Sequence, residues 1–348
     1  MRATAQSASS TEFRVTGGLV RGVESADGSL LFLGVPYAAP PVGVRRWAPP
    51  APVVPWTGVR AATDAPPPCT QLDEGWNTRD AANGSEDCLY LSVRAPRHVS
   101  GARLPVMVWI HGGSNRAGSG YGIASSPIYT RGMVVVGIEY RLGALGFLGA
   151  PELRAESAHA SSGNYGLLDQ IAALEWVRHN ISAFGGDPAQ VTVAGQSAGA
   201  VDIGLLLRSP LARGSFSRVI YESGELPPAR SAEENERIGA SLLTAYGFSH
   251  DAAGLAKLRA APATEVMKRA NELIAEGDER DRVWMGAAAD GWVLPIGAND
   301  LYRSDGQTRV PMIVGNVQRE VPIDLSLSEI EKLARLYFRS NASKVLAL

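Results

Sequence analysis

The sequence predicts an α/β fold in which helices cover both faces of a mostly parallel sheet. Two apolar runs near residues 104–110 and 132–138 have the length and composition of buried strands, and a helical pattern follows over 167–180. A third strand-like run occupies residues 191–194. Strands that alternate with helices along a chain typically form a parallel sheet, because each helix returns the chain to the starting edge.

The remaining elements are expected around this alternation, and together they form one domain over residues 1–348. Two short strand patterns that flank a glycine pair predict a small antiparallel prelude within residues 1–30. The proline-rich stretch 39–68 is too apolar for a linker and predicts irregular wrapping. Further along we expect a strand and turn at 216–224, helices over 231–275, a strand at 310–315 and a last helix from Ser326.

The composition is that of a globular protein, and it argues against several classes of function. Hydrophobic residues make up 45% of the chain and charged residues 20%. A formal net charge of -2 gives no electrostatic case for nucleic acid or an anionic membrane surface. Because the sequence lacks an apolar run of about 18 residues, we expect no membrane-spanning helix. The charge and hydropathy therefore leave a small molecule as the expected partner, with the oligomeric state open.

The most informative motif is the pentapeptide GQSAG at residues 195–199, which places Ser197 between a strand and a helix-compatible segment. This arrangement is typical of a nucleophile elbow, a sharp turn that holds a serine in a strained backbone conformation. The serine hydroxyl then lies at a helix N-terminus, where developing negative charge is stabilised. The alternative is an ordinary turn between a strand and a helix.

A second motif, HGGS at residues 111–114, follows the strand pattern at 104–110. Glycines at such a position leave backbone N–H groups free to point into a site, and acyl transfer needs such donors for the oxyanion of the tetrahedral intermediate. In hydrolases of this fold class a further donor to the oxyanion is the backbone N–H of the residue after the nucleophile, here Ala198. We therefore predict an oxyanion hole from Gly112, Gly113 and Ala198. A glycine turn without catalytic meaning is the alternative.

With these motifs the sequence resembles the type-B carboxylesterase family, the cholinesterase-like branch of the α/β-hydrolases, from about residue 12 to about residue 325. The resemblance implies an α/β-hydrolase fold and a serine esterase that needs neither a metal nor an organic cofactor. The matching segments, in the order of the family, are FLGVPYA at 32–38, PPVG at 40–43, EDCLYL at 86–91, YRLG at 140–143, GNYGLLDQ at 163–170, WVRHNI at 176–181 and FGGDP at 184–188.

Two segments near the site depart from the family pattern. Gln196 replaces the glutamate that usually precedes the serine, which removes a charge beside the nucleophile but not the nucleophile itself. Ser114 and Asn115 replace the third glycine of the oxyanion loop and the aromatic residue after it. The donors of that loop are backbone groups, so the loop keeps its function in this interpretation while the shape of the acyl pocket changes.

The resemblance also assigns the acid of the catalytic triad. In the family a carboxylate follows the strand that matches residues 310–315, and the matching residue here is Glu320, in the expected chain order after the serine. Val321 replaces the glycine that usually follows. Ser223 matches a buried family serine that lies near this acid. A surface charge at Glu320 and an ordinary turn residue at Ser223 remain the alternatives.

No histidine follows Glu320, although the family places its catalytic base there. The five histidines of the chain are His98, His111, His159, His179 and His250, and all precede the acid. None of them suits the role of a base. We therefore expect a C-terminally incomplete domain without its final strands and its histidine; a naturally short protein is the alternative.

The two cysteines, Cys69 and Cys88, lack the spacing of metal ligands. The family resemblance implies that they form a disulfide that closes a surface loop, and two separate buried thiols are the alternative. A disulfide favours an oxidising compartment, so we expect a secreted or periplasmic protein, with the cytoplasm left open. The segment Ala3-Thr4-Ala5 also has the small residues of a signal cleavage site.

Two classes of function follow. The first is a serine carboxylester hydrolase in which Ser197 attacks the ester and Glu320 orients a histidine that this chain does not supply. The second is a non-catalytic binding or adhesion protein of the cholinesterase-like type, or an inactive fragment. Such adhesion proteins tend to lose the nucleophile, so the intact Ser197 favours the enzyme. The sequence does not identify the ester.

Overall fold

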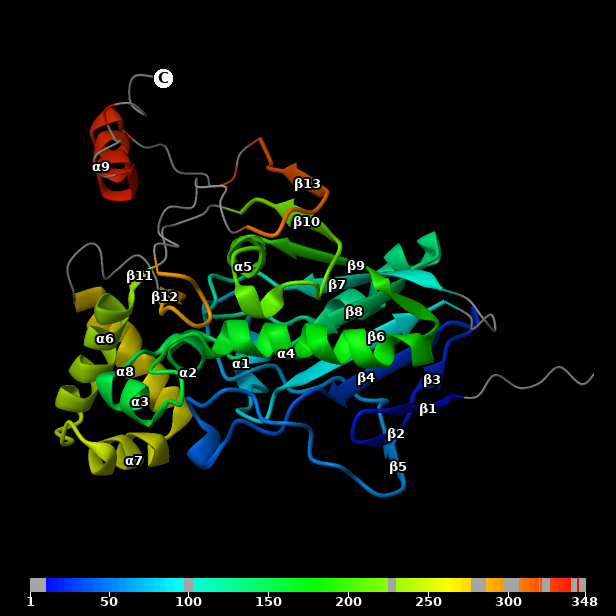
Figure 1. Cartoon of the computed structure of the whole chain (residues 1–348), viewed down its shortest axis with the longest axis horizontal. Helices are drawn as coiled ribbons and strands as arrows, with labels where there is room; N and C mark the ends of the chain where they lie inside the picture. Colours follow the sequence, from blue (N-terminus) through cyan, green and yellow to red (C-terminus); the bar gives the residue numbers. More distant parts are fainter. Residues whose placement is uncertain are drawn as a thin grey trace, which may run out of the picture.

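The computed structural model describes residues 11–96, 103–224, 230–276, 286–296, 307–318, 320, 326–338 and 343. Its centre is a sheet whose strands have the spatial order β13-β10-β9-β7-β8-β6-β4-β3 (Figure 1). These strands are β3 (Val23–Glu24), β4 (Leu30–Pro36), β6 (Tyr90–Ala95), β7 (Leu104–Ile110), β8 (Val134–Ile138), β9 (Gly186–Gln196), β10 (Arg218–Glu222) and β13 (Met312–Gly315).

The larger part of the central sheet is parallel, as the sequence predicts. Strands β13, β10, β9, β7 and β8 are paired in parallel, and β6, β4 and β3 continue the sheet in antiparallel pairs. The parallel strands all end at the same edge of the sheet. Ser197 follows β9, the loop at residues 111–120 follows β7, and Ser223 follows β10. The topology therefore gathers the predicted site residues at one edge.

Two smaller sheets and nine α-helices complete the described part of the chain. The predicted prelude is the antiparallel pair β1 (Glu12–Val15) and β2 (Gly18–Arg21), to which β5 (Val59–Ala61) adds in parallel. Strands β11 (Arg230–Ser231) and β12 (Ala288–Ala289) form the other small sheet. The helices are α1 (Thr78–Ala82), α2 (Gly143–Phe147), α3 (Pro151–Glu156), α4 (Tyr165–Asn180), α5 (Ala198–Leu206), α6 (Ala232–Ala245), α7 (Ala252–Ala260), α8 (Ala263–Glu276) and α9 (Leu327–Phe338).

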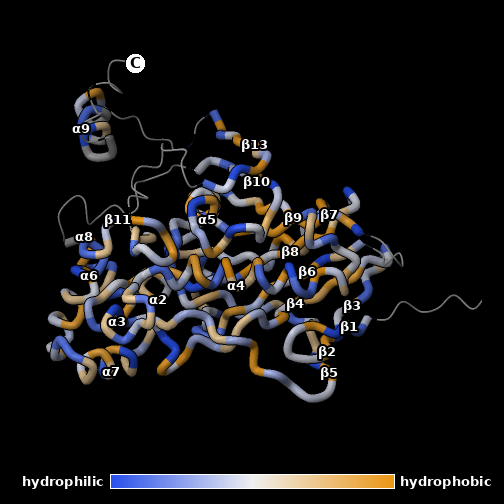
Figure 2. Tube along the Cα trace, in the orientation of Figure 1, coloured by the Kyte–Doolittle hydropathy of each residue, from blue (hydrophilic) through white to orange (hydrophobic). Residues whose placement is uncertain are grey.

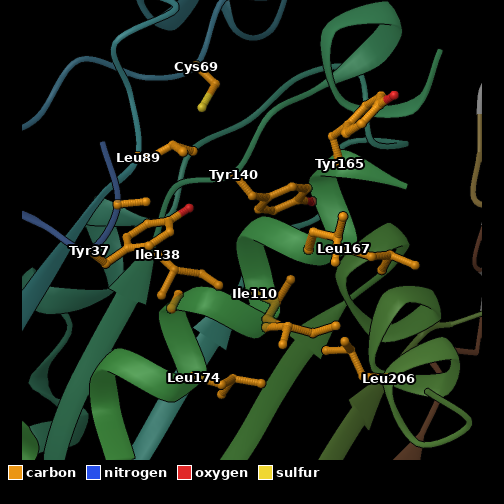
Figure 3. Packing of buried hydrophobic residues seen from close by; sticks show 14 of the residues in the cluster. Tyr37, Cys69, Leu89, Ile110, Ile138, Tyr140, Tyr165, Leu167, Leu174 and Leu206 are labelled. Atoms are coloured by element: carbon orange, nitrogen blue, oxygen red, sulfur yellow. The ribbon is translucent and has the colours of Figure 1, made fainter. Parts of the chain in front are cut away.

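Helices α4 and α5 cover one face of the sheet and close the main hydrophobic core. The side chain of Ile110 at the end of β7 lies with Leu174 of α4 and Leu206 of α5 (Figure 3), and each is at most 1% exposed. The opposite face carries a smaller cluster around Met107 and Val135. In the described part of the chain that face is covered by the short 3-10 helices η2 (Tyr121–Ser125) and η3 (Pro127–Arg131).

The pairing of the two cysteines is confirmed. Cys69 and Cys88 form a disulfide with their Cα atoms 4.9 Å apart, and both residues are buried. The bond closes a loop, residues 69–88, that contains α1. In the chain-entropy picture a bridge across this span stabilises the fold by about 3 kcal/mol.

Strand β13 lies at the edge of the sheet and is exposed along its whole length. The side chains of Ile313 and Val314 are 66% and 63% exposed, although Figure 2 shows apolar residues on β13 as on the central strands. No described strand pairs with its outer edge. Among the helices that the structure describes, none is long and apolar enough to span a bilayer.

Candidate active site

The backbone turns sharply between β9 and α5, and Ser197 is the residue at the turn. Its φ is 53° and its ψ is -124°, a conformation that L residues rarely adopt. The strand ends at Gln196 and the helix begins at Ala198, so the predicted strand–turn–helix arrangement is present. The N–H of Ser197 donates to the carbonyl of Glu222 at the end of β10, 2.9 Å away, which ties the turn to the neighbouring strand.

The glycines on either side of Ser197 are required by close contacts. A Cβ on Gly199 would lie 2.1 Å from the carbonyl oxygen of Ile110, which belongs to the adjacent strand β7. A Cβ on Gly195 would lie 2.7 Å from the carbonyl carbon of Gly199 itself. Strand and helix therefore approach so closely that neither position accommodates a side chain.

The oxyanion loop, residues 111–115, lies directly against the serine turn. A Cβ on Gly112 would lie 3.1 Å from the Cβ of Ser197 and 2.6 Å from the carbonyl oxygen of Gln196. Gly113 has a φ of 112°, and its carbonyl accepts hydrogen bonds from the N–H groups of Arg116 and Ala117. The loop thus places Gly112 and Gly113 next to Ser197 and close to the N-terminus of α5.

Ala198 is the first residue of α5, so its N–H has no acceptor within the helix. The positive end of the helix dipole lies at the same point. Gly112 and Ala198 therefore lie beside Ser197, and the oxyanion hole of Gly112, Gly113 and Ala198 stays a prediction. The described residues contain no group of His, Cys, Asp and Glu side chains that could hold a metal ion.

The disulfide loop packs against the far side of the oxyanion loop. The side-chain amide of Gln71 exchanges two hydrogen bonds with the backbone of Gly118, at 2.8 and 2.9 Å. Ser119 donates to Asp80 at 2.9 Å. The indole of Trp76, although 65% exposed, lies 3.3 Å from where a Cβ of Gly113 would stand. An exposed aromatic ring therefore borders the site, and only the tertiary structure reveals it.

The predicted acid lies beyond the same edge of the sheet, at the surface. Glu320 is exposed, and its Oε1 accepts a hydrogen bond of 2.8 Å from the N–H of Val317. Ser223 follows β10, has a φ of 49° and donates its N–H to the carbonyl of Gly315. Ser223 therefore follows β10, which neighbours β9, and Glu320 follows β13, the next strand beyond β10. The triad role of Glu320 and the supporting role of Ser223 remain predictions.

The four described histidines have partners of their own, and His98 falls outside the described residues. His111 is buried, stacks on Tyr140 at 4.4 Å and has its Nδ1 2.8 Å from the carbonyl oxygen of Gly112; burial lowers its pKa to about 4. His159 stacks on Trp292 with centroids 3.8 Å apart. The other two are exposed, at the end of α4 (His179) and beside Glu152 (His250).

Two buried carboxyl groups near the site were missed by the sequence analysis. Asp202 on α5 is fully buried, and burial raises its pKa to about 7. Glu139 at the end of β8 accepts hydrogen bonds from the N–H groups of Gly120 and Tyr121, and burial raises its pKa to about 8. The signal that could have found Asp202 is its place in a helix that is otherwise apolar.

Comparisons with known proteins identify the family of the chain. The model of the family described as "Carboxylesterase family" matches residues 9–344. The chain belongs to this family. Among curated relatives, the fumonisin B1 esterase of Sphingopyxis macrogoltabida is 42% identical over 299 residues, which cover 84% of this chain and 54% of that protein. The para-nitrobenzyl esterase of Bacillus subtilis is 36% identical over 342 residues, 90% of this chain and 68% of the relative.

Solved carboxylesterases share the fold. A para-nitrobenzyl esterase structure matches with a TM-score of 0.81 and 33% identity, over 96% of this chain and 71% of the other. A carboxylesterase from Geobacillus stearothermophilus matches with a TM-score of 0.75 and 36% identity, over 88% of this chain and 61% of that one. The central sheet is therefore that of an α/β-hydrolase. The chain spans about half the length of the fumonisin B1 esterase.

Proposed function

We propose that this carboxylesterase-family chain carries the nucleophile and the oxyanion hole of a serine carboxylester hydrolase. The observation that supports this most directly is the backbone conformation of Ser197. This residue lies between a strand and a helix N-terminus and has a φ of 53°. Such strain is retained where the surrounding structure requires it, and here Gly199 and Gly112 both pack closely around it. A binding protein of the same fold would have no need of a serine hydroxyl at this turn.

In the proposed reaction the hydroxyl of Ser197 attacks the carbonyl carbon of a small-molecule ester. The carbonyl oxygen becomes an oxyanion, which accepts hydrogen bonds from the N–H groups of Gly112, Gly113 and Ala198. The alcohol leaves with a proton, and an acyl-enzyme ester remains on Ser197. Water then attacks the same carbonyl carbon, which releases the acid and restores the serine hydroxyl.

The proton of Ser197 must pass to a general base, and we propose that none of the four described histidines takes this role. His159, His179 and His250 are exposed, with His159 stacked on Trp292, and His111 is buried with its Nδ1 directed at the carbonyl of its neighbour. In this proposal Glu320 orients an imidazole that these residues do not supply. A serine without a base is a weak nucleophile, so we expect slow turnover by this chain.

Imidazole added to the buffer tests both parts of the proposal. The 348-residue chain and its Ser197→Ala variant are assayed with p-nitrophenyl acetate, with and without imidazole. We expect rates close to background without imidazole. With imidazole, which can act as the missing base, the native chain should exceed Ser197→Ala severalfold, and mass spectrometry should find the acyl group on Ser197.

Two outcomes contradict parts of this proposal. Equal rates of the native chain and Ser197→Ala in imidazole would count against Ser197 as the nucleophile. Rapid serine-dependent turnover without imidazole would mean that a histidine of this chain is the base, and Ala substitution of the five histidines in turn would identify it.

A further inference from the structure

Asp202 is a buried carboxyl group whose two partners are neutral amides. It lies on α5, five residues after Ser197, and is 0% exposed. Its Oδ1 accepts a hydrogen bond of 2.9 Å from Asn115, and its Oδ2 accepts one of 2.5 Å from Gln170 on α4. Burial of a carboxyl group is costly, which is why its pKa rises to about 7. A buried group of this kind needs a structural reason.

Asn115 belongs to the oxyanion loop and is itself fully buried, with a φ of 53°. Its backbone carbonyl accepts a hydrogen bond of 2.6 Å from the N–H of Gly143. The hydroxyl of Tyr140 lies 3.0 Å from its Oδ1 and 2.8 Å from the carbonyl oxygen of His111, so it donates to one or the other. The loop is therefore held at His111 and at Asn115, on either side of the two glycines.

The hydrogen bond between Asn115 and Asp202 joins the two sources of oxyanion donors. Asn115 lies two residues after Gly113, and Asp202 lies one helical turn after Ala198. The two oxygens of the Asp202 carboxyl group face the donating side-chain amides of both partners. We propose that Asp202 is a positioning residue that holds the oxyanion loop in register with the N-terminus of α5 through Asn115.

The groups around Asp202 favour this role over a direct part in the chemistry. Burial raises the pKa values of Tyr140, in the loop after β8, and of Tyr221 on β10, and the neighbouring Asp202 raises both further. The Oε1 of Gln170 has no hydrogen-bond partner among the described residues. In Asp202→Asn, the new side-chain oxygen would still accept from Asn115. The new side-chain amide would donate to the Oε1 of Gln170, once the Gln170 amide has flipped. Asp202→Asn is therefore a conservative variant that keeps the link.

Hydrogen exchange of the backbone amides at residues 112–117 tests the proposal in the full 348-residue chain. We expect Asp202→Ala and Asn115→Ala to raise exchange in this segment about tenfold, because each breaks the link. Asp202→Asn should exchange like the native chain. Leu258→Ala, which empties a buried position on α7, serves as the destabilised control and should leave the segment unchanged relative to the rest of the sheet.

Hydrogen exchange tests the positioning role of Asp202 separately from the proposed function. The catalytic meaning of that role rests on the proposed function. Unchanged exchange at residues 112–117 in Asp202→Ala, or an increase of equal size throughout the sheet, would overturn the positioning role. Failure of Asp202→Asn to restore protection would also contradict it. Exchange needs no turnover, so a chain without esterase activity still gives an answer. Where turnover is measured with imidazole, Asp202→Ala should lower kcat with little change in KM, because the oxyanion forms only after binding.

Discussion

The two sides of Ser197 differ in how they are held. On the oxyanion side lie residues 111–120, α5 and the disulfide loop 69–88, whose contacts include the paired amides of Gln71 and Gly118 and the buried Asn115–Asp202 hydrogen bond. On the acid side lie the ends of β10 and β13, where Glu320 is exposed and bonded to Val317.

The difference is one of burial. Burial fixes geometry because displacing a packed or hydrogen-bonded group costs free energy, whereas an exposed side chain exchanges its contacts with water at little cost. The oxyanion side is therefore preorganised by the described residues. The position of the acid side depends on the register of the parallel strands β10 and β13. Substitutions matched across the two sides should separate these cases.

The largest effect is expected from Gly199→Ala on the oxyanion side. Its Cβ would meet the carbonyl oxygen of Ile110 at 2.1 Å, so strand or helix must shift, and we expect a loss of about 4 kcal/mol or more in the free energy of unfolding. Gly315→Ala on the acid side is the control, since no atom of the described residues lies within 4 Å of its added Cβ. Urea denaturation measures both, and similar losses would contradict the comparison.

The next effect is a pH dependence that Asp202→Asn should remove. The pKa of Asp202 rises from 3.8 unfolded to about 7 folded, so the native state holds a proton that the unfolded chain has lost between about pH 4 and 7. Stability from this group is full below about pH 4 and is lost as the pH rises to 7. Relative to the native chain, the variant should gain at most about 4 kcal/mol over that range.

Two other buried groups titrate nearby and are common to both proteins. Glu139 has a slope of the same sign because its pKa is raised to about 8, and His111 has the opposite sign because its pKa is lowered to about 4. The difference between native chain and variant, measured by urea denaturation from pH 4 to 8, isolates Asp202. A difference that does not change with pH would show that Asp202 is ionised throughout this range.

Removal of the disulfide should cost about 3 kcal/mol, since it frees a loop with a sequence separation of 19 residues. The double variant Cys69→Ala/Cys88→Ala should unfold at lower urea concentration than the oxidised native chain. It should also increase hydrogen exchange around Gly118, because Gln71 of the disulfide loop is bonded there. Equal midpoints of oxidised and reduced native protein would contradict this prediction.

The smallest effect comes from a matched pair of valines. Val193 of β9 is fully buried, and Val193→Ala should cost about 2 kcal/mol. Val314 of β13 is 63% exposed, and Val314→Ala should cost less than about 0.5 kcal/mol. Denaturation midpoints compare the two. A loss at Val314 as large as that at Val193 would mean that β13 is buried in solution, and that the two sides of Ser197 are held equally.

The sequence by itself determined the local features of this protein. The order of strands and helices follows from apolar periodicity, and the turn at Ser197 follows from two glycines at fixed spacing, because both signals depend on residues close together in the chain. The family motifs supplied the pairing of Cys69 with Cys88, which the structure confirms. The roles of Ser197 and Glu320 stay predictions.

The tertiary structure decided what depends on residues far apart in the sequence. Asn115 and Asp202 are separated by 87 positions, and nothing local to either predicts their hydrogen bond. Trp76 reaches Gly113 only because the disulfide loop packs against the oxyanion loop. Such contacts depend on the register of the sheet and on the packing of a helix against it. Their contribution to stability arises from groups that meet only in the folded chain.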